Sequence, residues 1–391
     1  MNYLMYIDQI NRSTPACVPV QYLVSGCDCY VRNTVLRNIL QQTRSAGRPV
    51  IVVGDGAEHG AQTLLIEQGY RLENGMSGEY FLCNPVQQLR SVKDISRLRQ
   101  LLAIMGYDEH QKGKLCTYLS LIQHLEQLRT GRPEPALSLE KLAAYCSTLA
   151  VEETLQTLLE EGTISPQQQM MYLSKYAECA EAGASFEDLF FLLIPFMKAE
   201  GRRLNGDSGI AVLFPTGDAL GSDDTLRSMI LKLLQYALED PAMSNTTVLV
   251  FDKGYGNRSA IAQLINSLPP HIDLHVFSED IFTLCEKPML AMILNRFSAR
   301  VYSRHLTMTS AQAIEAACGD IQVVKKTYNV TYDRRLRANR PLDVLFGTNK
   351  TENYSTTAPV REPRYPKEMI LQLSPGTGIV QYMGNSAIFT I

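Results

Sequence analysis

Two short apolar runs set the strongest limit on how this chain of 391 residues folds. Val50–Val53 and Thr246–Phe251 are continuous and rich in β-branched residues, which is typical of strands buried on both faces of a parallel sheet. Segments with helical spacing of apolar residues separate these runs from further predicted strands at Val20–Val24, Gly78–Asn84, Gly209–Pro215, Asp273–Phe277 and Ala299–Ser303. The alternation predicts an α/β fold in which helices flank a mostly parallel sheet.

The periodicity of the apolar residues changes between residues 86 and 203. Apolar residues such as Ile95, Leu98 and Leu101 recur there at helical intervals, and no strand-like run interrupts them. We therefore expect an all-α domain at residues 86–203, inserted into an α/β domain formed by residues 1–85 and 204–391. An insertion that stabilises the protein and serves docking, with no chemistry of its own, is the plainest interpretation. Its later helices are predicted at Val151–Glu161, Pro166–Ala182 and Phe186–Ala199.

The composition is that of a soluble globular protein, with 45% hydrophobic and 20% charged residues and a formal net charge of −3. Nucleic-acid binding therefore depends on a local basic patch rather than on the overall charge. The nine cysteines include one C-x-C pair, Cys27 and Cys29, with no matching pair of ligands nearby. We expect reduced thiols and no metal site. We see neither a signal peptide nor an apolar run near the roughly 20 residues that a membrane helix needs, and expect a cytoplasmic protein.

A strand, a tight loop and a helix are predicted over Val20–Ile39, the arrangement that holds phosphate in many nucleotide-binding proteins. Their loop has the pattern G-x-x-x-x-G-K-[ST]. Laid on this pattern from Gly26, the chain has Val31 for the second glycine, Arg32 for the lysine and Asn33 for the metal-binding hydroxyl, with Thr34 one place late. A β-branched valine makes the positive φ of that glycine costly. An ordinary turn between strand and helix, without a ligand, is the alternative.

An acidic residue follows the second apolar run. Asp252 comes directly after Phe251, at the position where phosphate-loop ATPases hold Mg²⁺ through water while a neighbouring glutamate polarises the attacking water. Here the neighbour is Lys253, which does not act as a base at neutral pH without strong desolvation. Asp252 also fits a plain capping or turn-forming residue.

A basic segment at Gln322–Arg340 has the alternation of a β-strand and places cations among Tyr328 and Tyr332. Basic residues interleaved with aromatic ones follow a nucleic-acid backbone while the rings stack on bases. The plainer interpretation, which we favour slightly, is a solvated hairpin edge whose charges prevent strand pairing. We predict a long loop over Gly347–Arg364, followed by a short helix and a last hairpin. The cations of the basic segment are Lys325, Lys326, Arg334, Arg335, Arg337 and Arg340.

Taken in order, these segments resemble the RecA-like ATPases of conjugation and type IV secretion, the coupling proteins of TraG/TraD type within the FtsK/HerA group. The resemblance implies a RecA-like, P-loop NTPase-type fold and an inserted helical domain that recognises DNA-processing or secretion substrates. The resemblance implies that Gly26, Thr34 and Asp252 correspond to positions of the family's nucleotide-binding site. It covers nearly the whole chain and rests on Gly26–Thr34, Val50–Glu58 (VIVVGDGAE), Asn84-Pro85, the helical insertion, Val248–Asp252 (VLVFD), Arg300–Asp320 and Pro363–Gly384.

The chain departs from the resembled family where that family binds and hydrolyses ATP. Arg32 and Asn33 replace the lysine and the hydroxyl residue of the phosphate loop, and Lys253 replaces a glutamate. Ser278-Glu279 replaces the glutamine that senses the γ-phosphate. Together these losses predict that the scaffold persists without hydrolysis, and hence that the protein has no cofactor.

We therefore expect a catalytically degenerate relative of the coupling-protein ATPases, acting as a soluble recruiting or scaffolding subunit. Its partners are a protein or nucleoprotein substrate bound by the helical domain, or the subunits of a homo- or hetero-oligomeric ring. One alternative is an atypical active ATPase that binds ATP and Mg²⁺, with Arg32 in the role of the lysine. The other is a nucleic-acid-binding protein that contacts DNA through residues 325–340.

Overall fold

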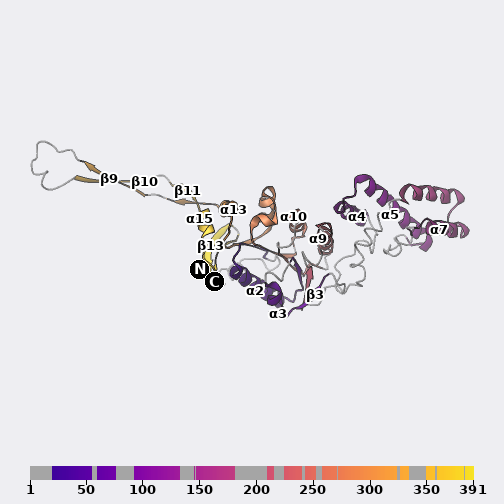
Figure 1. Cartoon of the computed structure of the whole chain (residues 1–391), viewed down its shortest axis with the longest axis horizontal. Helices are drawn as coiled ribbons and strands as arrows, with labels where there is room; N and C mark the ends of the chain where they lie inside the picture. Colours follow the sequence, from indigo (N-terminus) through magenta and orange to yellow (C-terminus); the bar gives the residue numbers. More distant parts are fainter. Residues whose placement is uncertain are drawn as a thin grey trace, which may run out of the picture.

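The structure is a computed structural model that describes residues 20–54, 60–75, 92–132, 145, 147–180, 209–214, 224–239, 243–251, 258–270, 272–323, 326–333, 349–356, 359–382 and 384–391. A nine-stranded sheet lies at its centre, in the order β13-β12-β7-β1-β6-β5-β2-β4-β3 (Figure 1). The strands are β1 (Tyr22–Ser25), β2 (Val50–Val53), β3 (Arg71–Asn74), β4 (Ile210–Phe214), β5 (Thr247–Phe251), β6 (Asp273–Ser278), β7 (Ala299–Tyr302), β12 (Thr377–Tyr382) and β13 (Asn385–Thr390).

The sheet is mostly parallel, as the apolar runs predicted. The strands from β7 to β3 in the sheet order pair in parallel, and β12 and β13 extend one edge in antiparallel. Side chains that alternate along a strand enter two different cores: Leu23 and Ile51 pack on one face, whereas Val24 and Val52 pack on the other. This burial on both faces explains why the strand sequences are continuous rather than alternating.

Helices cover both faces of the sheet. Two helices, α2 (Cys29–Ser45) and α3 (Ala61–Glu67), pack on the face that contains Val24, and the later helices pack on the opposite face (Figure 1). The later elements are α9 (Asp224–Leu238), α10 (Arg258–Ser267), α11 (Ile281–Leu284), the 3-10 turn η3 (Lys287–Met289), α12 (Leu290–Arg296), α13 (Met308–Cys318) and α15 (Lys367–Leu371).

Every regular element that the structure describes between β3 and β4 is a helix. These are α4 (Val92–Ile104), α5 (Glu109–Thr130), α7 (Thr148–Glu160) and a helix over residues 166–180. Asp108 begins α5 in a capping box with Gln111, and Gly131 ends it in the left-handed conformation. The helical block joins the rest of the protein through α4 and α9, where Arg97 and Glu239 approach to 2.7 Å.

Two antiparallel ribbons follow α13. The first pairs β8 (Asp320–Val323) with β11 (Val360–Pro363), and the second pairs β9 (Lys326–Asp333) with β10 (Asn349–Thr356). The β9–β10 hairpin projects from the sheet on the side away from α4, α5 and α7 (Figure 1). The predicted loop over Gly347–Arg364 is therefore wrong. Among the described strands, β10 pairs only with β9, so no sheet core requires apolar alternation in its sequence.

The remaining predictions fall into three groups. The strands β1, β2, β4, β5, β6 and β7 and the helices α7 and α15 lie where the sequence predicted them, and the predicted terminal hairpin is β12 and β13. The helices α9 and α13 match the helical spacing of apolar residues over Ser222–Glu239 and Ser310–Cys318. The strand β3 and the helix α10 were not predicted. The predicted elements at Gly78–Asn84 and Phe186–Ala199 lie outside the described residues. Among the described helices, none has the length and apolar character needed to cross a membrane.

Candidate functional site

The carboxyl ends of β1, β6 and β7 lie side by side, and a loop of only three residues joins β1 to α2. Open α/β sheets bind ligands at this edge. Gly26 begins the loop with a φ of +132°, and a Cβ at this position would lie 2.1 Å from Oγ of Ser303. The positive φ favours glycine, and the close approach of Ser303, which follows β7, leaves no room for a Cβ.

Backbone carbonyls at the end of β6 and just after β7 accept two of the amide hydrogens of this loop. The Gly26 N–H donates to the carbonyl oxygen of Ser278 at 2.9 Å, and the Cys27 N–H donates to the carbonyl oxygen of Arg304 at 2.9 Å. A phosphate-binding loop instead turns such amide hydrogens toward the ligand. Here they hold together the ends of the three strands.

The carboxylate of Asp28 caps the N-terminus of α2. Its Oδ1 accepts hydrogen bonds from the Tyr30 N–H at 2.9 Å and the Val31 N–H at 3.2 Å. Its Oδ2 accepts the Gly376 N–H at 2.7 Å, which ties the start of α2 to the turn before β12. A carboxylate at a helix N-terminus is stabilised by the helix dipole. Asp28 thus supplies, from within the chain, the negative group that a phosphate would supply.

The residues after Gly26 that were laid on the phosphate-loop pattern all lie inside α2. Val31 is fully buried in the core between α2 and the sheet, so it does not take the place of a loop glycine. Arg32 is 7% exposed, and its Nε has no hydrogen-bond partner among the described residues. Asn33 is half-buried and faces the turn at Gly60, because a Cβ there would lie 4.0 Å from its Nδ2. Thr34, also half-buried, is one residue further along the helix.

A buried serine and histidine lie beneath the loop. Oγ of Ser25 lies 2.9 Å from Nε2 of His305, and Nδ1 of His305 lies 2.8 Å from the carbonyl oxygen of Ser303. Burial lowers the pKa of His305, so the ring is neutral, with Nδ1 donating to the carbonyl and Nε2 accepting from the serine. The pair has the geometry of a nucleophile and its base. Both side chains are buried from solvent, however, and a substrate has no access to them.

A second polar cluster joins the end of β6 to the start of α13. Oδ1 of Asp280 accepts from Oγ of Ser310 at 2.5 Å, and its Oδ2 accepts from Oγ1 of Thr307 at 2.9 Å. Asp280 also caps α11 by accepting the Phe282 N–H at 2.9 Å. This carboxylate stands two residues after Ser278, near the position expected for a γ-phosphate sensor, and all of these contacts are within the chain. The sequence predicted neither Asp280 nor His305.

Of the other residues that the sequence predicted, all but Lys326 lie outside the described part of the chain. Asp252 and Lys253 follow β5, which ends at Phe251 as predicted, but neither is described. In the basic segment, Lys326 begins β9 and pairs with Thr356. The cations Lys325, Arg334, Arg335, Arg337 and Arg340 are also outside the described residues.

Comparisons with known proteins identify the fold. No protein-family model and no curated protein matches the chain. Three solved structures align over almost all of it. The bacterial conjugative coupling protein TrwBdeltaN70, in its unbound monoclinic form, is 13% identical with a TM-score of 0.53, covering 100% of this chain and 91% of its own. VirB4 of Thermoanaerobacter pseudethanolicus is 13% identical with a TM-score of 0.52, covering 95% and 88%. The plasmid coupling protein TrwB in complex with ADP and Mg²⁺ is 13% identical with a TM-score of 0.52, covering 100% and 91%.

This likeness confirms the RecA-like, P-loop NTPase-type fold that the order of motifs implied. The strand β1 and the helix α2 are the strand and the helix between which the sequence predicted a phosphate loop. What occupies the junction between them here is the carboxylate of Asp28 and the residues after β7.

Proposed function

We propose that this chain is a catalytically degenerate relative of the type IV secretion and conjugation coupling-protein ATPases. It recruits a protein or nucleoprotein substrate through the helical domain at residues 86–203, or joins a ring with active ATPase subunits. The observation that carries the proposal is the Asp28 carboxylate at the N-terminus of α2, where its three hydrogen bonds use the amide hydrogens of Tyr30, Val31 and Gly376.

The electrostatics of the junction between β1 and α2 oppose nucleotide binding and hydrolysis. A nucleotide phosphate is anionic and binds where amide hydrogens and a helix dipole face an open space. At this junction Asp28 contributes a fixed negative charge instead, and the Gly26 and Cys27 amides are bonded to neighbouring strands. A phosphate has to displace the Asp28 carboxylate from its three amide hydrogens, at a cost of roughly 2–3 kcal/mol, and then bind beside the displaced carboxylate.

A phosphate-release assay with ATP and Mg²⁺ tests this proposal. We expect the wild-type chain and the Asp252→Asn variant to release phosphate at the same background rate. Turnover that survives repurification and is lost in Asp252→Asn would instead establish an atypical ATPase. In that case Arg32→Ala tests whether the arginine takes the role of the missing lysine.

The β9–β10 hairpin supports a second candidate function, contact with a nucleic-acid backbone. It projects away from the sheet, and the chain between its strands contains Arg334, Arg335, Arg337 and Arg340 (Figure 1). Cations in the segment that follows β9 in the sequence can pair with a phosphate backbone. For the R334E/R335E/R337E variant we expect weaker DNA binding and a smaller salt dependence. Binding and salt slope that match the wild type would eliminate this function.

A further inference from the structure

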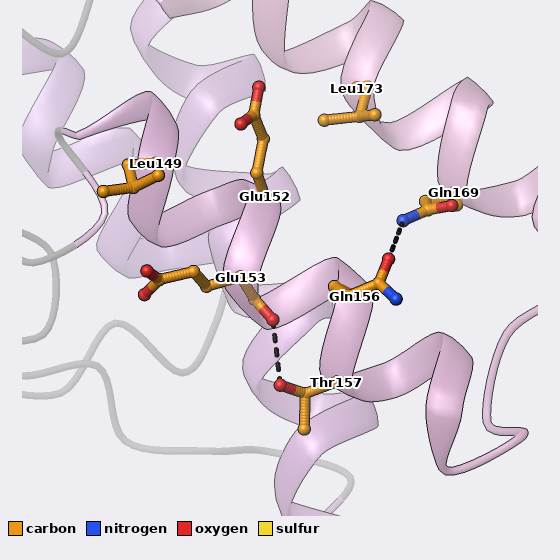
Figure 2. Close-up of a pocket in the computed structure, with 7 residues that line it drawn as sticks. All are labelled: Leu149, Glu152, Glu153, Gln156, Thr157, Gln169 and Leu173. Carbon is orange, nitrogen blue, oxygen red and sulfur yellow. Dashed lines mark hydrogen bonds between the residues drawn. The ribbon is translucent and has the colours of Figure 1, made fainter.

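A groove lies between two neighbouring helices of the helical block. It has a volume of about 710 Å³ and is lined by one side of α7 and by the facing side of the helix over residues 166–180 (Figure 2). Gln169 from the second helix donates to Oε1 of Gln156 on α7 at 3.3 Å and spans the groove at one end. The other lining residues are Leu149, Glu152, Glu153, Thr157 and Leu173.

The groove exposes apolar side chains that a folded protein usually covers. Leu149 at the start of α7 is 63% exposed, and Leu173 lines the opposite side. Met170, which is 74% exposed, does not line the groove but precedes Leu173 by three residues, so it lies beside the groove at an adjoining position of the same helix. Exposed leucine and methionine side chains together favour contact with an apolar partner, and methionine adapts its shape to one.

The charge of the groove has one sign. Glu152 and Glu153 are exposed, and neither carboxylate has an ion-pair or hydrogen-bond partner among the described residues. Residues 147–174 contain no lysine, arginine or histidine, and their four acidic residues include Glu160 and Glu161 near the end of α7. The groove thus combines apolar contacts with an uncompensated negative field, which attracts a cationic partner.

We propose that this groove binds a basic amphipathic helix of a partner protein. Leucine or similar side chains on one face of that helix contact Leu149 and Leu173 in the groove and Met170 beside it, and its lysine or arginine side chains lie against Glu152 and Glu153. An amphipathic helix in a groove between two helices is a common mode of recognition. The inference rests on the proposed recruiting function and adds the charge and shape of the segment that the helical domain recruits.

The test uses the full chain and a synthetic helical peptide. A fluorescent peptide of leucine and lysine, about 14 residues long to match the length of α7, is titrated with the protein while its anisotropy is measured. We expect saturable binding that weakens at high salt and a glutamate-for-lysine peptide that does not bind. The E152K/E153K variant should weaken binding by about tenfold or more, because it reverses two charges at the contact.

Two variants separate the apolar contacts from a general charge effect. L149S/M170S should also weaken binding by about tenfold, because it removes both exposed apolar anchors. Glu178→Lys changes an exposed acid on the helix over residues 166–180 that does not line the groove, and should change binding by less than about twofold. Equal melting temperatures for the variants and the wild type exclude misfolding.

Three results would overturn the inference. They are absence of binding by the lysine peptide, equal binding of the glutamate peptide, and equal loss of binding in Glu178→Lys and E152K/E153K. Self-association of the chain that E152K/E153K abolishes, with no peptide bound, would assign the groove to a second copy of the protein. A failure of the proposed function can be told apart from a failure of this inference. ATP turnover by the wild-type chain would overturn the proposed function and would leave peptide binding unaffected.

Discussion

Replacing Asp28 with alanine tests how the junction between β1 and α2 is held. The carboxylate accepts three amide hydrogens, two in the first turn of α2 and one from Gly376 before β12. Loss of an N-cap costs roughly 0.5–2 kcal/mol, and loss of a hydrogen bond to a charged group roughly 1.5–3 kcal/mol. Because Asp28 is half-buried, we take the lower part of both ranges and expect local destabilisation of roughly 2–3 kcal/mol.

Hydrogen exchange of individual amides measures this loss where it arises. In Asp28→Ala the Gly376 and Val31 amides should exchange roughly 30- to 150-fold faster, the rate change that corresponds to 2–3 kcal/mol. Asp28→Asn keeps one oxygen that can cap α2, so its effect at the Val31 amide should be less than half as large. Its Nδ2 is a donor that cannot accept the Gly376 N–H, so the Gly376 amide should exchange as fast as in Asp28→Ala. Asp108→Ala removes the cap of α5 in the helical block and should leave the Gly376 amide unchanged. Unchanged exchange at Gly376 in Asp28→Ala would refute the tie between α2 and the turn before β12.

Three further substitutions test the packing around the sheet. Gly26→Ala places a Cβ 2.1 Å from Oγ of Ser303, so we expect a loss of roughly 2–4 kcal/mol in the free energy of unfolding, read from urea midpoints; wild-type stability would contradict the close approach. Asp273→Ala removes the carboxylate that lies 3.1 Å from the Arg48 guanidinium, and should lower the free energy of unfolding by roughly 2–4 kcal/mol in the same assay. An effect below about 0.5 kcal/mol would show that the ion pair is dispensable. Burial lowers the pKa of His305 below 6.5, so below pH 6.5 the unfolded chain takes up a proton that the folded chain excludes. The contribution of neutral His305 to the free energy of unfolding is therefore complete above pH 6.5 and declines below it by up to roughly 1.4 kcal/mol per pH unit. His305→Gln should flatten this decline when melting is measured as a function of pH.

The parts of the fold that the sequence predicted are those whose pattern follows from burial. Val50–Val53 and Val248–Phe251 are buried on both faces of the sheet, so each residue had to be apolar and the strands were recognisable. The strand β3 was missed because, among the described strands, it lies at the sheet edge and pairs only with β4, which allows the partly polar sequence Arg71–Asn74. The strand β10 was missed because, among the described strands, it pairs with β9 alone and so its sequence does not need the apolar alternation of a strand in a packed sheet.

The candidate site was predicted only in part. Aligning a long phosphate loop from Gly26 placed Arg32 and Asn33 outside the helix, whereas α2 begins at Cys29. The signal for the earlier start was Asp28 itself, because aspartate before an apolar helical pattern is a strong N-cap. The pair of Ser25 and His305 had no sequence signal, since the two residues are 280 positions apart and meet only through the pairing of β1 with β7.

Calorimetric titration of the full chain with ATP and Mg²⁺ is the most direct test of the central claim, which is that the chain's own carboxylate and strand ends occupy the phosphate position. The account predicts no saturable heat of binding for the wild type. It predicts the same result for Asp28→Asn, because the Gly26 and Cys27 amides remain bonded to the neighbouring strands. Saturable binding of ATP by the wild type, weakened by Asp252→Asn, would contradict the account and show that the junction opens to accept a nucleotide.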